Sequence, residues 1–462
     1  MILERLSRRE FVHAMAGTMG VGASAASAGS AEPPQAIWNH QDKPGSHPYP
    51  GNVKADIWVF SGQSNSQGWG LFKAPVEPDP RIMFFDSENR WVVAQEPLNP
   101  RFYNWTPEPV AQNILLQRGT LDFTGKDVVE AFVQHLRNDH VHLGGIGPGL
   151  FFAKHLVKFI DRPVGLVYCG VGGSPIKSWD PALRGEPGKP ANYRAMLDRI
   201  AMIGGGIKGL IWYQGESDAM TFGAEDVYER ALLQLIDNVR ADTHLPDLPF
   251  ICVQIARFVW PYNSHARGFE TIRDIQRRVS LLRKNVYTVS ALDLPLEDPA
   301  HLSFEGHQRL GPRLAEIALS QVYRQAGHAT PIILGKTEVL QADNRRPMIR
   351  VRFKGVSGKL TSPGLPTGFE IRSAALPSRE PQPPSADFAA PVVYRVDFDP
   401  EDPAAVIIGV FDDAMINSGG AKHHPLAGPF SIVYGPGMSP YVNVVDEKDM
   451  PVPAFGPVGV TS

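Results

Sequence analysis

Three serines follow an unbroken apolar run in "IWVFSGQSNSQGWG" (residues 57–70), and each could be a nucleophile. A serine attacks a carbonyl only when a base takes its proton, a carboxylate orients that base, and donors stabilise the oxyanion. Further along the chain, "EDPAH" places Asp298 and His301 three residues apart, with Pro299 stiffening the turn between them. One loop could therefore present both an acid and an imidazole to a serine from elsewhere in the chain.

Four polar segments with glycines follow predicted strands: "SGQSN", "CGVGGSPIKSWD", "YQGESD" and "LDLPLEDPAHLSFEGH". The strands are the continuous apolar runs "DIWVF", "VGLVYC", "GLIWY", "FICVQIA" and "VYTVSAL", which lack alternating polarity and therefore indicate a parallel sheet buried on both faces. Segments with helical spacing lie between them, which predicts a doubly wound α/β/α fold. Because sites form beyond the carboxyl ends of such strands, we expect the four segments to share one rim.

Two regions depart from this pattern. "RIMFFDSENRWVVAQEPL" predicts a hairpin with a Ser-Glu-Asn turn, and we interpret residues 72–145 as an inserted excursion over one face of the sheet. Beyond about residue 328 the helical spacing gives way to runs such as "MIRVRFKG", "GFEIRSA", "VVYRVDF", "AAVIIGVF" and "FSIVYG", which predict an all-β, sandwich-like module. We therefore predict a catalytic domain over 32–328 and a C-terminal β accessory module over 329–462.

The four segments, in this order, resemble the motifs of the SGNH hydrolases, and more narrowly those of the sialate O-acetylesterase branch of carbohydrate esterases. The resemblance covers about residues 55–325. It implies a flavodoxin-like α/β/α fold, Ser64 as nucleophile, His301 as general base and Asp298 as its orienting partner. The implied activity is a serine esterase that removes O-acetyl groups from carbohydrates through an acyl-enzyme, with no metal or cofactor. Since His301 must be neutral to act as a base, we expect activity to fall below about pH 6.

The same resemblance implies an oxyanion hole made of the Ser64 N–H, a glycine of "GGS" and the Gln214 amide, which stands where other branches use an asparagine. The glycine is either Gly172 or Gly173. Glu216 is expected to hold its loop in place. The expected substrate contacts are Gln63, Asn65, Trp69 and Trp179. Ser66 and Gln67 stand where the branch usually has a methionine, which predicts a more polar wall beside the nucleophile.

Two alternatives remain open. "GESDA" nearly matches the nucleophile elbow of α/β-hydrolases, with Ser217 as nucleophile and Asp293 or Asp298 and then His301 following in that order. The second alternative is a protein that binds glycans without turning them over. The sequence also leaves the ester open among O-acetyl sialic acid, acetylated xylan or pectin, and short-chain esters.

Composition and the N-terminus bear on location and partners. The net charge of −3 over 462 residues does not favour a nucleic-acid or membrane-surface partner. Arg8 and Arg9 precede a mild apolar stretch and the small-residue pattern "ASA", so residues 1–31 resemble a twin-arginine export signal and predict a periplasmic or extracellular protein without stable membrane insertion. Cys169 and Cys252 lie in different predicted strands, and we expect buried free thiols.

Overall fold

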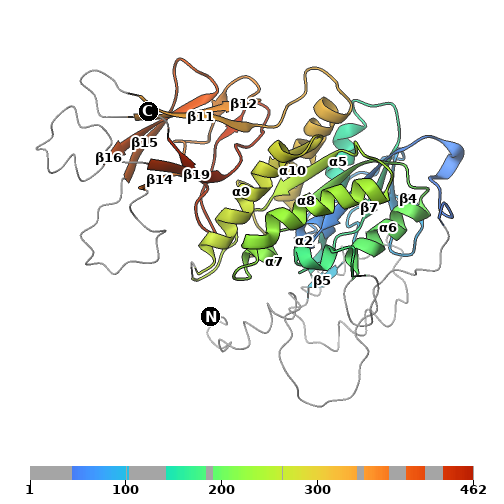
Figure 1. Cartoon of the computed structure of the whole chain (residues 1–462). Helices are drawn as coiled ribbons and strands as arrows, with labels where there is room; N and C mark the ends of the chain where they lie inside the picture. Colours follow the sequence, from blue (N-terminus) through green and yellow to red (C-terminus); the bar gives the residue numbers. More distant parts are fainter. Residues whose placement is uncertain are drawn as a thin grey trace, which may run out of the picture. The chain divides into compact units, whose positions relative to one another are not determined.

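The apolar runs form a central, mostly parallel sheet in the computed structural model of the chain, which describes residues 44–99, 101–103, 142–183, 191–262, 264–340, 348–373, 392–411 and 430–460 (Figure 1). Its strand order is β10-β9-β8-β1-β7-β3-β4. The strands are β1 (Asp56–Gly62), β3 (Ile82–Phe85), β4 (Trp91–Val93), β7 (Val164–Tyr168), β8 (Ile207–Tyr213), β9 (Phe250–Gln254) and β10 (Val286–Ser290). Every residue of β1, β7 and β9 is buried, which confirms the interpretation of the unbroken apolar runs.

The predicted hairpin is present as the antiparallel pair β3 and β4. Residues 72–145 are not entirely an excursion over one face, however, because β3 pairs in parallel with β7 and extends the central sheet. A small antiparallel sheet, in the order β2-β6-β5, contains β2 (Gly70–Leu71), β6 (His142–Ile146) and β5 (Arg101–Tyr103).

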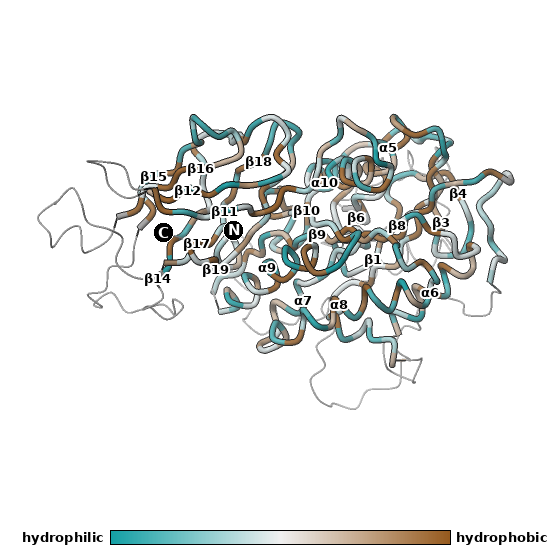
Figure 2. The backbone as a smooth tube through the Cα atoms, turned by 45° about the horizontal axis from the view of Figure 1, so that its top comes forward, coloured by the Kyte–Doolittle hydropathy of each residue, from teal (hydrophilic) through white to brown (hydrophobic). Residues whose placement is uncertain are grey.

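The chain forms two compact units. The first contains the described residues up to Cys252, together with Leu294–Ala315. Its main helices are α5 (Gly149–Leu156), α6 (Asn192–Met202), α8 (Glu225–Asp242) and α10 (Phe304–Ile317), and its shorter ones are η1 (Pro50–Asn52), α2 (Ser64–Gln67), η2 (Ile176–Trp179) and α7 (Glu216–Ala219). Figure 2 shows α5 and α10 on one side of β1 and β8, and α6 and α8 on the other. The strands of this unit are thus covered on both faces.

The second unit contains Val253–Asp293 and the chain from Glu316 onward. It holds α9 (Ala266–Leu282), η3 (Ala318–Val322) and antiparallel sheets in the orders β11-β12-β16-β15, β14-β17-β19 and β13-β18. The strands are β11 (Ile333–Leu340), β12 (Met348–Lys354), β13 (Leu360–Thr361), β14 (Phe369–Ser373), β15 (Val392–Phe398), β16 (Ala405–Phe411), β17 (Phe430–Tyr434), β18 (Val445–Asp446) and β19 (Phe455–Gly459). All five strands predicted for this region are present.

Helix α9 belongs to the second unit because its buried polar side chains bind the C-terminal segments. The guanidinium of Arg273, which is 1% exposed, donates to the carbonyls of Gly437 and Met438, and also to those of Ile255 and Ala256. The second unit therefore includes α9 as well as the C-terminal strands.

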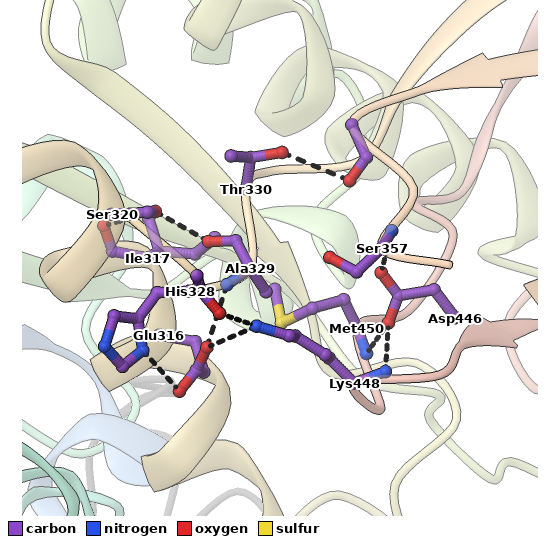
Figure 3. A network of polar contacts seen from close by, with 12 residues as sticks. Glu316, Ile317, Ser320, His328, Ala329, Thr330, Ser357, Asp446, Lys448 and Met450 are labelled. Carbon is purple, nitrogen blue, oxygen red and sulfur yellow. Dashed lines mark hydrogen bonds and ion pairs between the residues drawn. The ribbon is translucent and has the colours of Figure 1, made fainter. Parts of the chain in front are cut away.

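A polar cluster also fixes the connection that follows η3 (Figure 3). One carboxylate oxygen of Glu316 lies 3.0 Å from His328 Nδ1, and the other accepts the N–H of Ala329 at 2.8 Å. On a neighbouring turn, the Asp446 carboxylate accepts the N–H groups of Ser357 and Met450. These contacts give both turns a defined backbone path.

Three further expectations concern the cysteines, membrane insertion and the export signal. Cys169 and Cys252 are buried and free, as predicted, and both β8 and β1 lie between their strands. Among the described residues, no helix has the length and apolar character needed to cross a bilayer. The predicted export signal, residues 1–31, lies outside the described residues.

Candidate active site

Ser64 is the first residue of the short helix α2, directly beyond the end of β1. The turn between them depends on Gly62, whose φ of +129° lies in the region that favours glycine. A Cβ on Gly62 would lie 2.1 Å from the carbonyl oxygen of Tyr213 at the end of the neighbouring strand β8. Glycine therefore lets β1 end close against β8 and present Ser64 at the rim.

Asp298 and His301 meet Ser64 from the loop before α10. His301 Nε2 lies 2.9 Å from Ser64 Oγ, and His301 Nδ1 lies 2.7 Å from Asp298 Oδ2. The other carboxylate oxygen of Asp298 accepts the N–H groups of Ala300 and His301, both at 2.8 Å, which folds the loop around the acid. A carboxylate at Nδ1 keeps the proton on that nitrogen, so Nε2 is left to accept the Ser64 hydroxyl proton.

The surroundings keep Asp298 charged. Burial pushes its pKa upward, but the hydrogen bond and charge of His301, together with the two backbone N–H groups, outweigh burial and leave the pKa below its usual value. The structure thus brings together the three residues that the sequence predicts as a triad.

Asn65 joins the nucleophile helix to the acid–base loop. Its Nδ2 donates to Glu216 Oε1 at 3.0 Å and to the carbonyl of Ala300 at 3.1 Å, and its Oδ1 accepts the N–H of Leu302 at 2.9 Å. Asn65 is 0% exposed. This burial corrects the expectation of a substrate contact at Asn65. Its hydrogen bonds to Glu216, Ala300 and Leu302 instead connect the helix that carries Ser64 to the loop that carries His301.

The Gln214 amide is also fully buried, and it forms hydrogen bonds with neighbouring protein groups. Nε2 has two N–H donors and three acceptors within reach: Asp218 Oδ2 at 2.5 Å, the Ser174 carbonyl at 3.1 Å and Gln63 Oε1 at 3.3 Å. Oε1 lies 3.1 Å from the hydroxyl of Tyr228. The Gln214 amide, predicted as an oxyanion donor, therefore already has acceptors in Asp218 and Ser174.

Gln63 takes the place beside the nucleophile. Its Oε1 accepts the N–H groups of Gly215 and Ser217 as well as Gln214 Nε2, each at 3.3 Å. Its Nε2 donates to no residue that the structure describes. Gln63 thus offers a side-chain donor one residue before Ser64, whereas the sequence predicts it only as a substrate contact.

The "GGS" loop carries the two candidate glycines. The N–H of Gly172 donates to Gln67 Oε1 at 3.0 Å. The N–H of Gly173, whose φ is +68°, donates to no described residue. Gln67 is partly exposed at this wall, whereas Ser66 is 1% exposed. Of these two polar residues, Gln67 is the one that borders the site.

The two tryptophans differ in position. Trp69 is partly exposed, and its ring stacks on the His301 imidazole, with 4.6 Å between centroids and 17° between planes. Trp179 is 1% exposed, donates to Ser174 Oγ and packs edge-on against Trp212. This burial corrects the expectation that Trp179 contacts a sugar.

Ser217, the alternative nucleophile, has a buried Oγ without a hydrogen-bond partner among the described residues. The histidine that an elbow serine would need is bonded to Ser64 instead. Within the described ranges, no group of three or more histidine, cysteine or acidic side chains is arranged to hold a metal ion.

Comparisons with known proteins show the family to which the chain is related. The sequence model of the family described as "Carbohydrate esterase, sialic acid-specific acetylesterase" matches residues 54–320. A "Probable carbohydrate esterase" of Arabidopsis thaliana is 33% identical over 289 residues, which cover 61% of this chain and 95% of that protein. The X-ray structure of that Arabidopsis protein aligns at 29% identity, over 58% of this chain and 98% of its own, with a TM-score of 0.42. A carbohydrate acetylesterase from Xanthomonas citri shares the fold at 20% identity, over 87% of this chain and 80% of its own, with a TM-score of 0.54.

Proposed function

Because the chain belongs to the sialic acid-specific acetylesterase family of carbohydrate esterases and is an ester hydrolase, we propose that it removes O-acetyl groups from carbohydrates, on an SGNH hydrolase fold, with Ser64 as nucleophile. Support comes from the contacts that join Ser64 Oγ to His301 Nε2 and His301 Nδ1 to Asp298 Oδ2, at 2.9 and 2.7 Å.

In the first half of the reaction, Ser64 Oγ attacks the acetyl carbonyl carbon while its proton passes to His301 Nε2. The C–O bond to the sugar then breaks, and the sugar oxygen takes the proton from His301. In the second half, water attacks the acyl-enzyme, gives a proton to His301, and acetate leaves as Ser64 recovers that proton. Asp298 stabilises the imidazolium that forms twice in the cycle.

The oxyanion needs donors that are not already engaged. We assign the N–H of Ser64, the N–H of Gly173 and Gln63 Nε2 to this role. We do not assign Gly172 or Gln214 as oxyanion donors, because the Gly172 N–H already binds Gln67 Oε1 and the Gln214 amide already binds the Asp218 carboxylate.

Acetate release from a panel of O-acetylated glycans tests the function. Purified protein should release acetate from at least one O-acetylated sialic acid, xylan or pectin, and Ser64→Ala should lower the rate by at least about 10³-fold. Acetate release that Ser64→Ala leaves intact would point to Ser217. Glycan binding without any acetate release would support the non-catalytic alternative.

We also propose export through the twin-arginine signal at residues 1–31. Replacing Arg8 and Arg9 together by lysine should keep the full-length chain in the cytoplasmic fraction, whereas the natural sequence should yield a shortened periplasmic or secreted chain. Unchanged processing after the double replacement would argue against this route.

A further inference from the structure

Asp218 is a buried carboxylate that the reaction scheme above does not use. It lies in α7, four residues after Gln214, and is 3% exposed. Its Oδ2 accepts two hydrogen bonds, from Gln214 Nε2 at 2.5 Å and from the N–H of Ile176 at 2.9 Å. It therefore joins the loop after β8 to the "GGS" loop after β7, directly behind the nucleophile.

A carboxylate can only accept hydrogen bonds, whereas a glutamine amide has one accepting end and one donating end. Asp218 therefore requires that the Nε2 end of Gln214 faces it, and the Ser174 carbonyl, which also accepts from Nε2 at 3.1 Å, favours the same orientation. Gln214 Nε2 also lies 3.3 Å from Gln63, and a donor at that position requires the accepting Oε1 end of Gln63 to face it. The Nε2 end of Gln63 is then directed away from the 214–218 loop.

We propose that Asp218 is a positioning residue that, through Gln214, fixes the direction of the Gln63 amide and so aims Gln63 Nε2 at the oxyanion. This inference rests on the proposed function, since it gives a cause for the oxyanion donor of that reaction. The N–H groups of Gly215 and Ser217 also face Gln63 Oε1, and each does so at 3.3 Å. Of the described hydrogen bonds of Gln63 and Gln214, the 2.5 Å contact to Asp218 is the shortest, and it is made to a carboxylate.

The charge state of Asp218 fits this role. Burial raises the pKa of Asp218 to about 6, although the hydrogen bonds from Gln214 and Ile176 and the charge of Lys177 act in the opposite direction. At pH 8, well above this pKa, the group is ionised and can only accept hydrogen bonds. When protonated, it can also donate, and its control over the orientation of Gln214 is lost.

The test is a double-mutant cycle on kcat and KM for acetate release, in the full chain at pH 8. Asp218→Leu should lower kcat about 10- to 100-fold with little change in KM, because an oxyanion donor acts in the transition state. Gln63→Leu should lower kcat about 10²- to 10³-fold. The decisive expectation is that Asp218→Leu has no further effect on kcat in the Gln63→Leu background, since it acts only through Gln63.

Asp218→Asn keeps the shape and one acceptor, so it should retain more activity than Asp218→Leu, and it replaces the leucine variant in the cycle if that variant does not fold. Asp226→Asn, at the start of α8 and outside these contacts, is the matched control and should keep the natural kcat. If the losses from Asp218 and Gln63 multiply, or if both Asp218 variants keep full kcat while Ser64→Ala is inactive, the positioning role is overturned and the esterase mechanism stands. Full activity of Ser64→Ala would instead overturn the mechanism itself.

Discussion

Trp69 contacts the imidazole that must accept and return a proton in each half of the reaction. Its stacked geometry restricts rotation of the His301 ring, and Asp298 restrains the same ring from its Nδ1 edge. A base held in one orientation loses less entropy on reaching the transition state. We therefore interpret Trp69 as a support for His301, where its sequence position suggested a sugar platform.

Trp69→Ala should lower kcat/KM for a small chromogenic acetyl ester about 10-fold, because the unsupported imidazole samples unproductive orientations. Trp69→Phe keeps an aromatic face and should lose no more than about 3-fold. Steady-state rates on the small ester and on an acetylated glycan, measured side by side, check this. A loss confined to KM for the glycan would show that Trp69 serves the sugar instead.

Glu96 gives a pH dependence of stability at the residue scale. It is 1% exposed, and burial raises its pKa to about 8, with only a partial opposing effect from the Leu98 N–H. Near pH 7 the folded chain therefore keeps this proton and the unfolded chain releases it. Because unfolding releases a proton, the Glu96 contribution lowers the free energy of unfolding by about 1.4 kcal/mol per unit of rising pH between roughly pH 5.5 and 7.5.

Glu96→Gln removes this titration, so its free energy of unfolding should fall less steeply with pH than that of the natural chain. Urea denaturation at pH 5.5, 6.5 and 7.5 measures the two slopes. Glu88→Gln, at an exposed position in the β3–β4 turn, should leave the slope unchanged. Parallel slopes for Glu96→Gln and the natural chain would contradict the expectation.

At the residue scale, the sequence indicated Ser64, Asp298 and His301 because each stands in a short motif directly after a predicted strand. The direction of the Gln63 and Gln214 amides could not be predicted in this way. It depends on Asp218 and on the N–H groups of Ile176, Gly215 and Ser217, which come from two different loops. The sequence does not show which end of an amide side chain faces the nucleophile.

At the scale of elements, the turn from β1 into α2 depends on close approach as well as on backbone angle. Gly62→Ala should prevent the native turn, because its Cβ would lie 2.1 Å from the Tyr213 carbonyl. Gly204 also has a positive φ, of +92°, but its Cβ would meet nothing within 4 Å. Gly204→Ala should therefore cost only the backbone strain, about 1 kcal/mol, and Gly62→Ala at least about 3 kcal/mol.

Thermal unfolding and acetate release, measured on both glycine variants, separate these effects. Gly62→Ala should show a lower unfolding midpoint and little activity, while Gly204→Ala should retain kcat. Equal losses of stability and activity in the two variants would show that the close approach of Gly62 to β8 does not add to the cost of the substitution.

The strands were predictable as elements because burial on both faces leaves a continuous apolar run. The sheet that a strand joins was less predictable. The β3–β4 hairpin shows its turn in the sequence, but nothing in that turn specifies that Ile82–Phe85 pairs in parallel with β7. Such a partner lies about eighty residues away, and only the packed sheet determines it.

At the scale of the whole molecule, the second unit combines segments separated by 102 to 200 residues. The Gln254 side chain donates to the carbonyl of Ala454 and accepts from its N–H, and Arg372 makes a bidentate ion pair with Glu270 of α9. The change in sequence pattern at about residue 328 marks where helices give way to strands. Helix α9, which lies before this change, also belongs to the second unit, and a helix with ordinary amphipathic spacing gives no sign of which loop carbonyls its buried arginine will bind.

Arg273 should therefore be a main support of the second unit. Arg273→Met keeps much of the side-chain volume but leaves the carbonyls of Gly437 and Met438 without their charged donor, which should lower the free energy of unfolding on the order of 3 kcal/mol. Arg273→Lys keeps the charge but not the planar guanidinium, so its free energy of unfolding should lie between those of the natural chain and Arg273→Met. Arg278, on the same helix, pairs with Asp274 at a 39% exposed side chain, and Arg278→Met should change stability by no more than about 1 kcal/mol. Chemical denaturation of the three variants tests this order. If Arg273→Met were no more destabilising than Arg278→Met, the packing of apolar side chains, and not the buried guanidinium, would have to account for the placement of α9 with the C-terminal strands.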